Sequence, residues 1–119
     1  MFGFEKLDVW QKSVEYADLI YRITQAFPPE ERFGLTSQLR RAAVSIASNI
    51  AEGTSRSSRA DFRRFIELAY GSLMESISEL QIAKRQRFLS DEAFEDTYNS
   101  AETLARMLSG LHRTFKKRS

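Results

Sequence analysis

Apolar residues recur at spacings of three and four along most of the chain, which is the period of amphipathic α-helices. Both prolines and most of the glycines lie between these periodic stretches, where helices are expected to end. The pattern predicts an all-α fold with four helices, over residues of about 8–27, 36–52, 58–88 and 90–115. At this length we expect a single domain, residues 1–119.

Short connections join the four predicted helices. Because a short loop forces consecutive helices to lie antiparallel, the sequence predicts an antiparallel up-down-up-down four-helix bundle. Side-chain oxygens that can accept a backbone N–H at a helix start are supplied by Asp8, Thr36, Ser58 and Ser90. Pro28 and Pro29 follow the first helix, and Gly53 is the predicted C-terminal cap of the second.

The third predicted helix is the longest, and it contains Gly71. Glycine inside a helix costs about 1 kcal/mol relative to alanine, so we expect a close contact with another backbone at this position. At about 1.5 Å per residue, this helix also extends beyond its partners and leaves apolar surface uncovered. The uncovered surface favours assembly into a homo-oligomer.

Positive charge is concentrated in one part of the chain. The net charge is +2, from 18 Lys and Arg against 16 Asp and Glu, but residues 32–64 carry seven basic side chains against two acidic ones. Six arginines form a candidate site for nucleic acid or another partner, converging where the second helix ends and the third begins: Arg40, Arg41, Arg56, Arg59, Arg63 and Arg64. Arginine suits phosphate, and copies of the cluster in an oligomer would act together.

The same arginines can instead form ion pairs within the protein or between subunits. Candidate partners are Glu52, Asp61, Glu67 and the acidic first helix of a neighbouring subunit. No aromatic residues interleave with the arginines on an expected exposed face, so the sequence predicts no platform for base stacking. Both interpretations stay open at this point.

Polar residues lie on or near the inner edge of the second helix. Buried polar groups in a bundle must find hydrogen-bond partners, and they then fix the register of the helices. We therefore predict a structural polar core rather than a catalytic site, made of Asn49 and Glu52 with Ser45, Ser48 and Ser72 as partners. The basic residues Lys116, Lys117 and Arg118 suit the C-terminal dipole of the fourth helix.

Composition excludes several classes of protein. The absence of cysteine rules out disulfides and thiolate metal sites, and a reducing cytoplasm is the expected location. No apolar run approaches the roughly 18 residues that a membrane span needs, so we expect neither secretion nor membrane association.

An enzyme is not expected. Two-metal helix bundles use a Glu-x-x-His motif on two helices, whereas His112 is the one histidine and has no evident orienting partner. Gly-rich phosphate loops and nucleophile elbows do not occur either. We predict no catalytic residue, no cofactor and no metal, although Glu52, Glu75 and Glu79 offer oxygen ligands for a hard cation as a minor alternative.

The second helix carries a long and specific run of residues, FGLTSQLRRAAVSI (33–46) followed by SNIAEG (48–53). Three further segments accompany it: LDVWQK (7–12), AFPPE (26–30) and AYGSLME (69–75). With these segments, residues 4 to about 90 resemble the bacterial family of 23S rRNA intervening-sequence proteins. One departure is Gln86 and Arg87, which stand where such proteins often have an apolar residue and glycine.

The resemblance implies a four-helix bundle, a ring-shaped homopentamer and no particular reaction. Members of the family are often encoded within insertions in ribosomal RNA genes. A similar bundle, the accessory variability determinant of diversity-generating retroelements, is a basic pentamer that binds nucleic acid and a reverse transcriptase. The present chain is far less basic, so the resemblance to that protein concerns its structure.

We therefore expect a non-catalytic, oligomeric four-helix-bundle protein that presents arginine clusters to nucleic acid, RNA or DNA, or to a nucleoprotein partner. The alternative is a pure protein-protein interaction module that binds no nucleic acid. A carboxylate metal-binding bundle is the minor third hypothesis.

Overall fold

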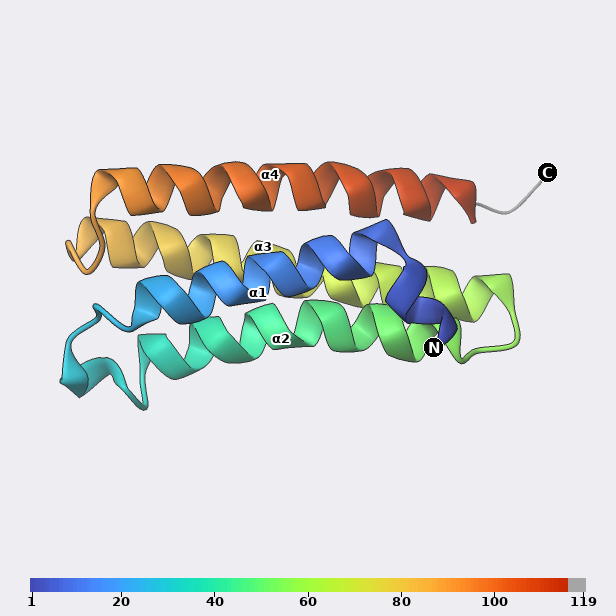
Figure 1. Ribbon diagram of the computed structural model, residues 1–119, viewed down its shortest axis with the longest axis horizontal. Coiled ribbons are helices and arrows are strands. Elements are labelled where there is room, and N and C mark those ends of the chain that lie inside the picture. Colours follow the sequence, from blue (N-terminus) through green and yellow to red (C-terminus); the bar gives the residue numbers. More distant parts are fainter. Residues whose placement is uncertain (116–119) are drawn as a thin grey trace.

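The computed structural model describes residues 1–115, which form an antiparallel bundle of four helices (Figure 1). In chain order they are α1 (Asp8–Thr24), α2 (Leu35–Thr54), α3 (Arg59–Arg85) and α4 (Asp91–Thr114). Short 3-10 turns, η1 (Gly3–Lys6) and η2 (Pro29–Glu31), precede α1 and α2. Each helix packs against its neighbours in the chain, and α4 closes the bundle against α1. The predicted all-α, up-down-up-down fold is confirmed.

These bounds differ from the predicted ones mainly at the C-terminal ends of α3 and α1, which both lie three residues earlier than expected. At α1 the cause is local. Its last turn tightens: the N–H of Phe27 donates to the carbonyl of Thr24 at 3.1 Å, and the Thr24 hydroxyl donates to the carbonyl of Ile20 at 2.7 Å. The ring of Phe27 is buried and lies 5.6 Å from that of Phe88. The burial of the Phe27 ring therefore ends the helix before Pro28 and Pro29 are reached. The basic residues 116–118 lie outside the described residues.

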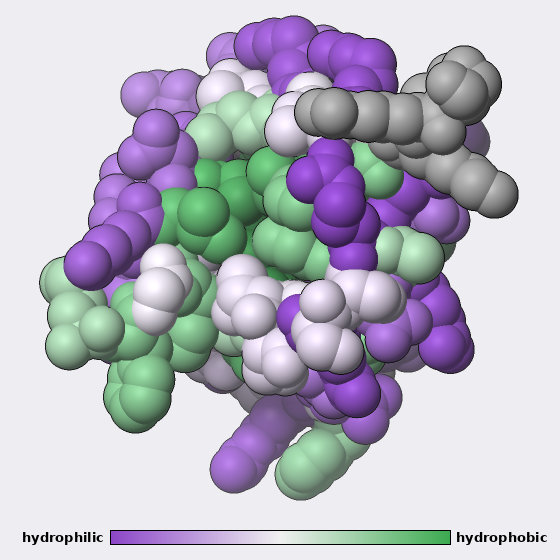
Figure 2. All heavy atoms as spheres, turned by 90° about the vertical axis from the view of Figure 1, so that its right-hand side faces the viewer, coloured by the Kyte–Doolittle hydropathy of each residue, from purple (hydrophilic) through white to green (hydrophobic). Residues whose placement is uncertain are grey.

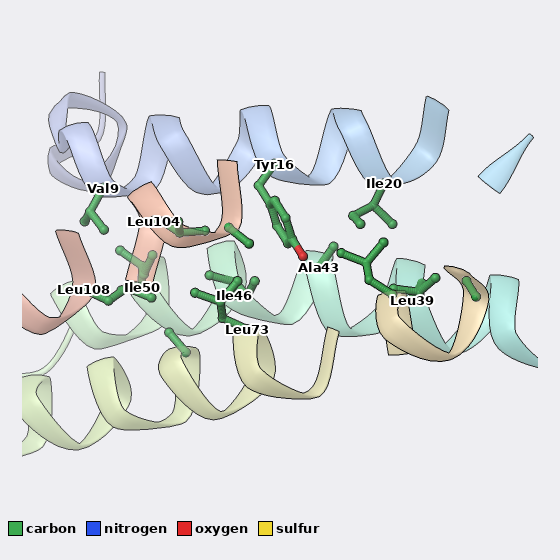
Figure 3. Packing of buried hydrophobic residues seen from close by; sticks show 14 of the residues in the cluster. Val9, Tyr16, Ile20, Leu39, Ala43, Ile46, Ile50, Leu73, Leu104 and Leu108 are labelled. Atoms are coloured by element: carbon green, nitrogen blue, oxygen red, sulfur yellow. The ribbon is translucent and has the colours of Figure 1, made fainter. Parts of the chain in front are cut away.

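The core consists of apolar side chains from all four helices (Figure 3). Burying one Leu or Ile side chain stabilises a fold by about 1.5–3 kcal/mol. The largest fully buried apolar residues are Tyr16, Ile20, Leu39, Ile46, Ile50, Ile66, Leu73, Leu80, Leu104 and Leu108.

None of the helices, within residues 1–115, combines the length and apolar character that crossing a membrane requires.

Tyr16 reaches from α1 into the middle of this core (Figure 3). Its hydroxyl lies 2.8 Å from that of Ser76, which itself donates to the carbonyl of Leu73 at 2.7 Å. The Ser76 proton is therefore used, and Tyr16 is the donor in the bond between the hydroxyls. Burial raises the pKa of Tyr16 to about 12.

Two of the four predicted helix caps are present. The side chains of Ser58 and Ser90 accept the N–H groups of Asp61 and Ala93, at 3.0 and 3.1 Å. The predictions for Asp8 and Thr36 are wrong, because the N-cap positions of α1 and α2 are Leu7 and Gly34, one and two residues earlier than predicted.

The glycines of α2 and α3 have roles opposite to those expected. Gly53 lies inside the last turn of α2, and a Cβ atom there would stand 2.8 Å from Cβ of Phe65 and 3.0 Å from Cδ1 of Phe62. It permits close packing against α3 and is not a cap. Gly71 has no atom within 4 Å of the position of a Cβ, so this chain does not supply the expected backbone contact.

The corner between α3 and α4 depends on Arg87, which has a φ of 61°. The N–H of Phe88 donates to the carbonyl of Ala83, and that of Arg87 to the carbonyl of Lys84, both at 3.0 Å. This is the pattern of a Schellman motif, whose left-handed position favours glycine. The arginine therefore strains the corner, while Phe88 anchors it against the core.

We predict that Arg87→Gly stabilises the protein. Relief of the left-handed strain outweighs the added chain entropy, for a net gain of about 0.5–1 kcal/mol in the free energy of unfolding. The melting temperature, followed by circular dichroism at fixed protein concentration, should rise by about 2–5 °C. Arg85→Gly is the matched control: it lies within the helix and should lower stability. A lower melting temperature for Arg87→Gly contradicts the prediction.

Candidate nucleic-acid interface

The six arginines predicted to converge fall into two groups at opposite ends of the bundle. Arg40 and Arg41 lie near the start of α2, whereas Arg56, Arg59, Arg63 and Arg64 lie at the α2–α3 connection. At about 1.5 Å per residue, α2 separates the two groups by roughly 20 Å. The expectation of one cluster is therefore wrong, because most of the length of α2 stands between its two parts.

The four arginines at the α2–α3 connection are called the loop-end arginines. Figure 2 looks onto this end, where hydrophilic residues border exposed apolar ones. Arg56 pairs with Oε1 of Glu52 at 3.1 Å and lies over the ring of Phe65. Arg59 donates to the carbonyl of Thr114 at 2.7 Å and lies over the ring of Phe115. Both side chains thus have partners within the chain.

The other two loop-end arginines differ in exposure. The Nε atom of Arg63 is buried and has no hydrogen-bond partner among the described residues, while Arg64 is exposed. Of the carboxylates proposed as partners, Glu52 binds Arg56 and Glu67 binds His112. Pairing within the chain therefore accounts for part of this group.

The second arginine group lines a groove of about 650 Å³. We call it the α2 groove, and its lining is Tyr21, Arg32, Phe33, Thr36, Ser37, Arg40, Arg41, Val44 and Ser45. It contains no carboxylate, and none of its three arginines takes part in an ion pair within residues 1–115. Its positive charge is thus not neutralised by direct pairing in the structure.

Arg40 is held in place within the α2 groove. Its Nε donates to Oγ1 of Thr24 at 2.9 Å, and its guanidinium lies 4.7 Å from the ring centre of Tyr21. Such a fixed side chain loses little conformational entropy when it binds a ligand. The guanidinium of Arg32 lies 5.3 Å from the ring centre of Phe33, in the connection just before α2.

Sequence reasoning missed the aromatic part of this groove. Phe33 is 88% exposed and Tyr21 is 44% exposed, so the prediction that no aromatic residue accompanies the arginines on an exposed face is wrong. Arg32 was also left out of the predicted site. The available signal was the position of Phe33 in a short polar connection, between an arginine and a glycine, where no helix face could bury it.

Three of the predicted polar-core residues meet between α2 and α3. The hydroxyls of Ser45 and Ser72 lie 2.9 Å apart, and Nδ2 of Asn49 donates to the carbonyl of Ser45 at 2.8 Å. These groups are half-buried and link the two helices. Glu52 lies apart from them, exposed and paired with Arg56.

Glu79 is the buried carboxyl group of α3, only 6% exposed, with an Oε1 atom that has no partner among the described residues. Burial, with a smaller contribution from the charge of Glu75, raises its pKa to about 7, while Arg41 acts in the opposite direction. Arg41 also lines a smaller cavity with Glu75. The arginine therefore stands between the α2 groove and these two carboxyl groups.

The structure does not bring the proposed oxygen ligands together. Glu52 lies near the end of α2 with Arg56, away from Glu75 and Glu79. In the described part of the chain, no three His, Asp or Glu side chains are grouped as a metal site requires.

His112 has an orienting partner that the sequence did not reveal. Its Nε2 lies 3.3 Å from Oε1 of Glu67, in a groove of about 350 Å³ between α3 and α4. Ser109 lines the same groove, but no hydrogen bond joins it to His112 in residues 1–115. The contact between His112 and Glu67 links α4 to α3.

Glu79 makes a pH-dependent contribution to stability. Its pKa is about 7 in the folded state against a usual value of 4.5, so between these pH values the folded protein keeps a proton that the unfolded chain has lost. The contribution is favourable below this window and is lost as the pH rises through it. Glu79→Gln should remove the dependence and raise stability at about pH 8 by about 1–3 kcal/mol.

Urea unfolding of the wild type and Glu79→Gln at about pH 5 and pH 8 measures this difference. Glu75→Gln is the control: it removes an exposed neighbouring charge, so it should reduce the pH dependence without abolishing it. An equal stability difference between wild type and Glu79→Gln at both pH values contradicts the assignment.

Comparison with known proteins agrees with the fold. The structure is similar to a crystal structure of a protein with unknown function from the S23 ribosomal protein family of Bacteroides thetaiotaomicron, with a TM-score of 0.78. The two are 26% identical, over 87% of this chain and 97% of that chain. No curated protein matches this chain. The sequence model described as 23S rRNA-intervening sequence protein matches residues 5–110, and the chain therefore belongs to this family.

Proposed function

We propose that this protein is a non-catalytic, oligomeric scaffold that binds nucleic acid through the α2 groove. The observation that carries the proposal is the gathering of Arg32, Arg40 and Arg41 in an open groove whose lining contains no carboxylate. Phosphate binding by such arginines releases the counterions of the nucleic acid. The bidentate guanidinium suits phosphate better than a lysine ammonium does.

The loop-end arginines have a smaller role in this proposal. Arg56 and Arg59 already bind Glu52 and the end of α4, so recruiting them for phosphate would break contacts that hold the helix ends. Arg64 is exposed and remains available. The α2 groove is therefore the primary surface and the loop end an accessory one.

Self-association through the outer face of α3 completes the proposal. Leu68, Met74 and Ile82 expose 45%, 38% and 50% of their surface on this helix. Gly71 lies among them with open space where a side chain would be, which leaves room for the close approach of another helix. A ring of copies, a pentamer by resemblance to the family, would repeat the α2 groove and strengthen binding through multivalency.

One prediction of this proposal concerns the salt dependence of nucleic-acid binding. Fluorescence anisotropy with labelled RNA and DNA of about 20 nucleotides should detect binding that weakens between about 50 and 200 mM salt. Arg41→Gln should weaken binding to all sequences and reduce the salt slope by about one per protomer. Arg106→Gln, which removes an exposed arginine from α4, is the matched control and should leave binding unchanged.

Absence of binding at the lower salt concentration would end the nucleic-acid proposal. The exposed apolar residues of the α2 groove would then favour the pure protein-interaction module. Under that alternative, we expect a specific protein partner whose association with this protein survives nuclease treatment and high salt.

Another prediction of this proposal concerns the assembly of subunits through α3. In a helix with room for the added methyl group, glycine to alanine stabilises by about 0.5–1 kcal/mol. Gly110→Ala in α4 should do so, because a Cβ there would stand at an ordinary contact distance of 3.8 Å from Nη2 of Arg113. Gly71→Ala should instead weaken assembly, because the added methyl group separates the packed helices. Ile82→Glu should give monomers, since it places a charge in the apolar contact.

Light scattering coupled to size-exclusion chromatography measures the mass of each variant. A wild-type monomer, or a Gly71→Ala variant that keeps the wild-type assembly and melts higher, contradicts contact at this face.

A further inference from the structure

We infer that the α2 groove binds single-stranded nucleic acid, with an unstacked base lying against the ring of Phe33. The inference rests on the proposed function and names its ligand class. It depends on a feature that phosphate binding alone does not use, the exposed aromatic surface among the arginines.

Phe33 is unusual among the large side chains of this protein. It lies in the connection between η2 and α2, it is 88% exposed, and it is absent from the hydrophobic core. The guanidinium of Arg32 lies 5.3 Å from the centre of the Phe33 ring. A ring exposed in this way contributes little to the stability of the monomer, and the surface that Arg32 does not cover is available to stack on a ligand.

The rest of the groove provides apolar surface next to positive charge. Tyr21 and Val44 are 44% and 43% exposed, and Arg40 lies over the tyrosine ring at 4.7 Å. Proteins that bind single strands without strong sequence preference combine aromatic surfaces for the bases with a positive groove for the backbone. The α2 groove contains both elements.

Geometry favours a single strand over a duplex. The faces of duplex bases are covered by their stacked neighbours, so a duplex can approach the arginines but cannot place a base on Phe33. The groove volume of about 650 Å³ lies within the range of about 300–1,000 Å³ that encloses small ligands. It is therefore large enough to receive part of a single strand.

The polar lining favours weak sequence preference. Apart from the arginines and the Tyr21 phenol, its polar side chains are the hydroxyls of Thr36, Ser37 and Ser45. A hydroxyl can donate or accept, so it discriminates poorly between the edges of different bases. Stacking and phosphate contacts should therefore dominate the affinity.

Three labelled probes of equal length test the inference by anisotropy: a DNA single strand, the same backbone with abasic sites, and a duplex. The wild type should bind the intact single strand about 5- to 100-fold more tightly than the abasic strand, because one stacked base contributes that much. It should also bind the single strand more tightly than the duplex. Phe33→Ala should remove the preference for bases, and Phe33→Trp should retain it.

Phe2→Ala is the matched control for loss of an exposed ring. Phe2 is 75% exposed, and it lies near the N-terminus, at the end of the bundle opposite to η2 (Figure 1). This variant should keep the affinity and the preference of the wild type. Circular dichroism and light scattering on each variant verify that fold and assembly are retained.

Equal binding of intact and abasic strands, or tighter binding of the duplex, overturns the inference. If Arg41→Gln still weakens binding in that case, the proposed function stands without it. If no probe binds, both fall. If Phe33→Ala changes the assembly state, the ring is a subunit contact and the inference is likewise overturned.

Discussion

Close packing of α2 against α3 is the constraint on which the rest of the molecule depends. Gly53 has no Cβ, and Cβ of Phe65 and the ring of Phe62 occupy the space where one would stand. Further along the interface, the small hydroxyls of Ser45 and Ser72 meet at 2.9 Å. Short side chains let the helix axes approach, and the half-buried hydrogen bond between the two hydroxyls sets their register. The longer polar residues of α2 are consequently left on its outer side, where they line the α2 groove.

A carboxylate partner distinguishes Arg56 from the arginines of the α2 groove. Glu52 is one helical turn before Arg56, so this loop-end arginine has a partner at 3.1 Å. The α2 groove has no carboxylate in its lining, although Arg41 also shares a smaller cavity with Glu75 and acts on the buried Glu79, whose pKa burial raises to about 7. The three groove arginines therefore have no carboxylate in direct contact within residues 1–115, whereas Arg56 has one, and they remain available to an anionic ligand.

The sequence was sufficient for the fold because helical periodicity and local capping act over a few residues. The four helices and the serine caps at Ser58 and Ser90 follow from such short-range signals. The roles of Gly53 and Gly71 could not be predicted from such signals. These roles depend on which side of each helix faces a neighbouring helix and at what distance. For the same reason, arginines close in sequence could not be assigned to one end of a helix bundle. The exposure of Phe33 was also hidden, because a connection has no periodicity that assigns its residues to a face.

The two surfaces of the proposed scaffold are compatible because they share no residue. The α2 groove is lined by residues 21–45, none of them from α3, whereas the exposed apolar residues of α3 lie between positions 68 and 82. Assembly through α3 would therefore leave each groove open. One weak groove contributes only a few phosphate contacts, and repetition raises the effective concentration of the others once the first is bound. A chain with a net charge of only +2 can bind an anionic polymer in this way, since the affinity comes from repeated local charge and not from the total.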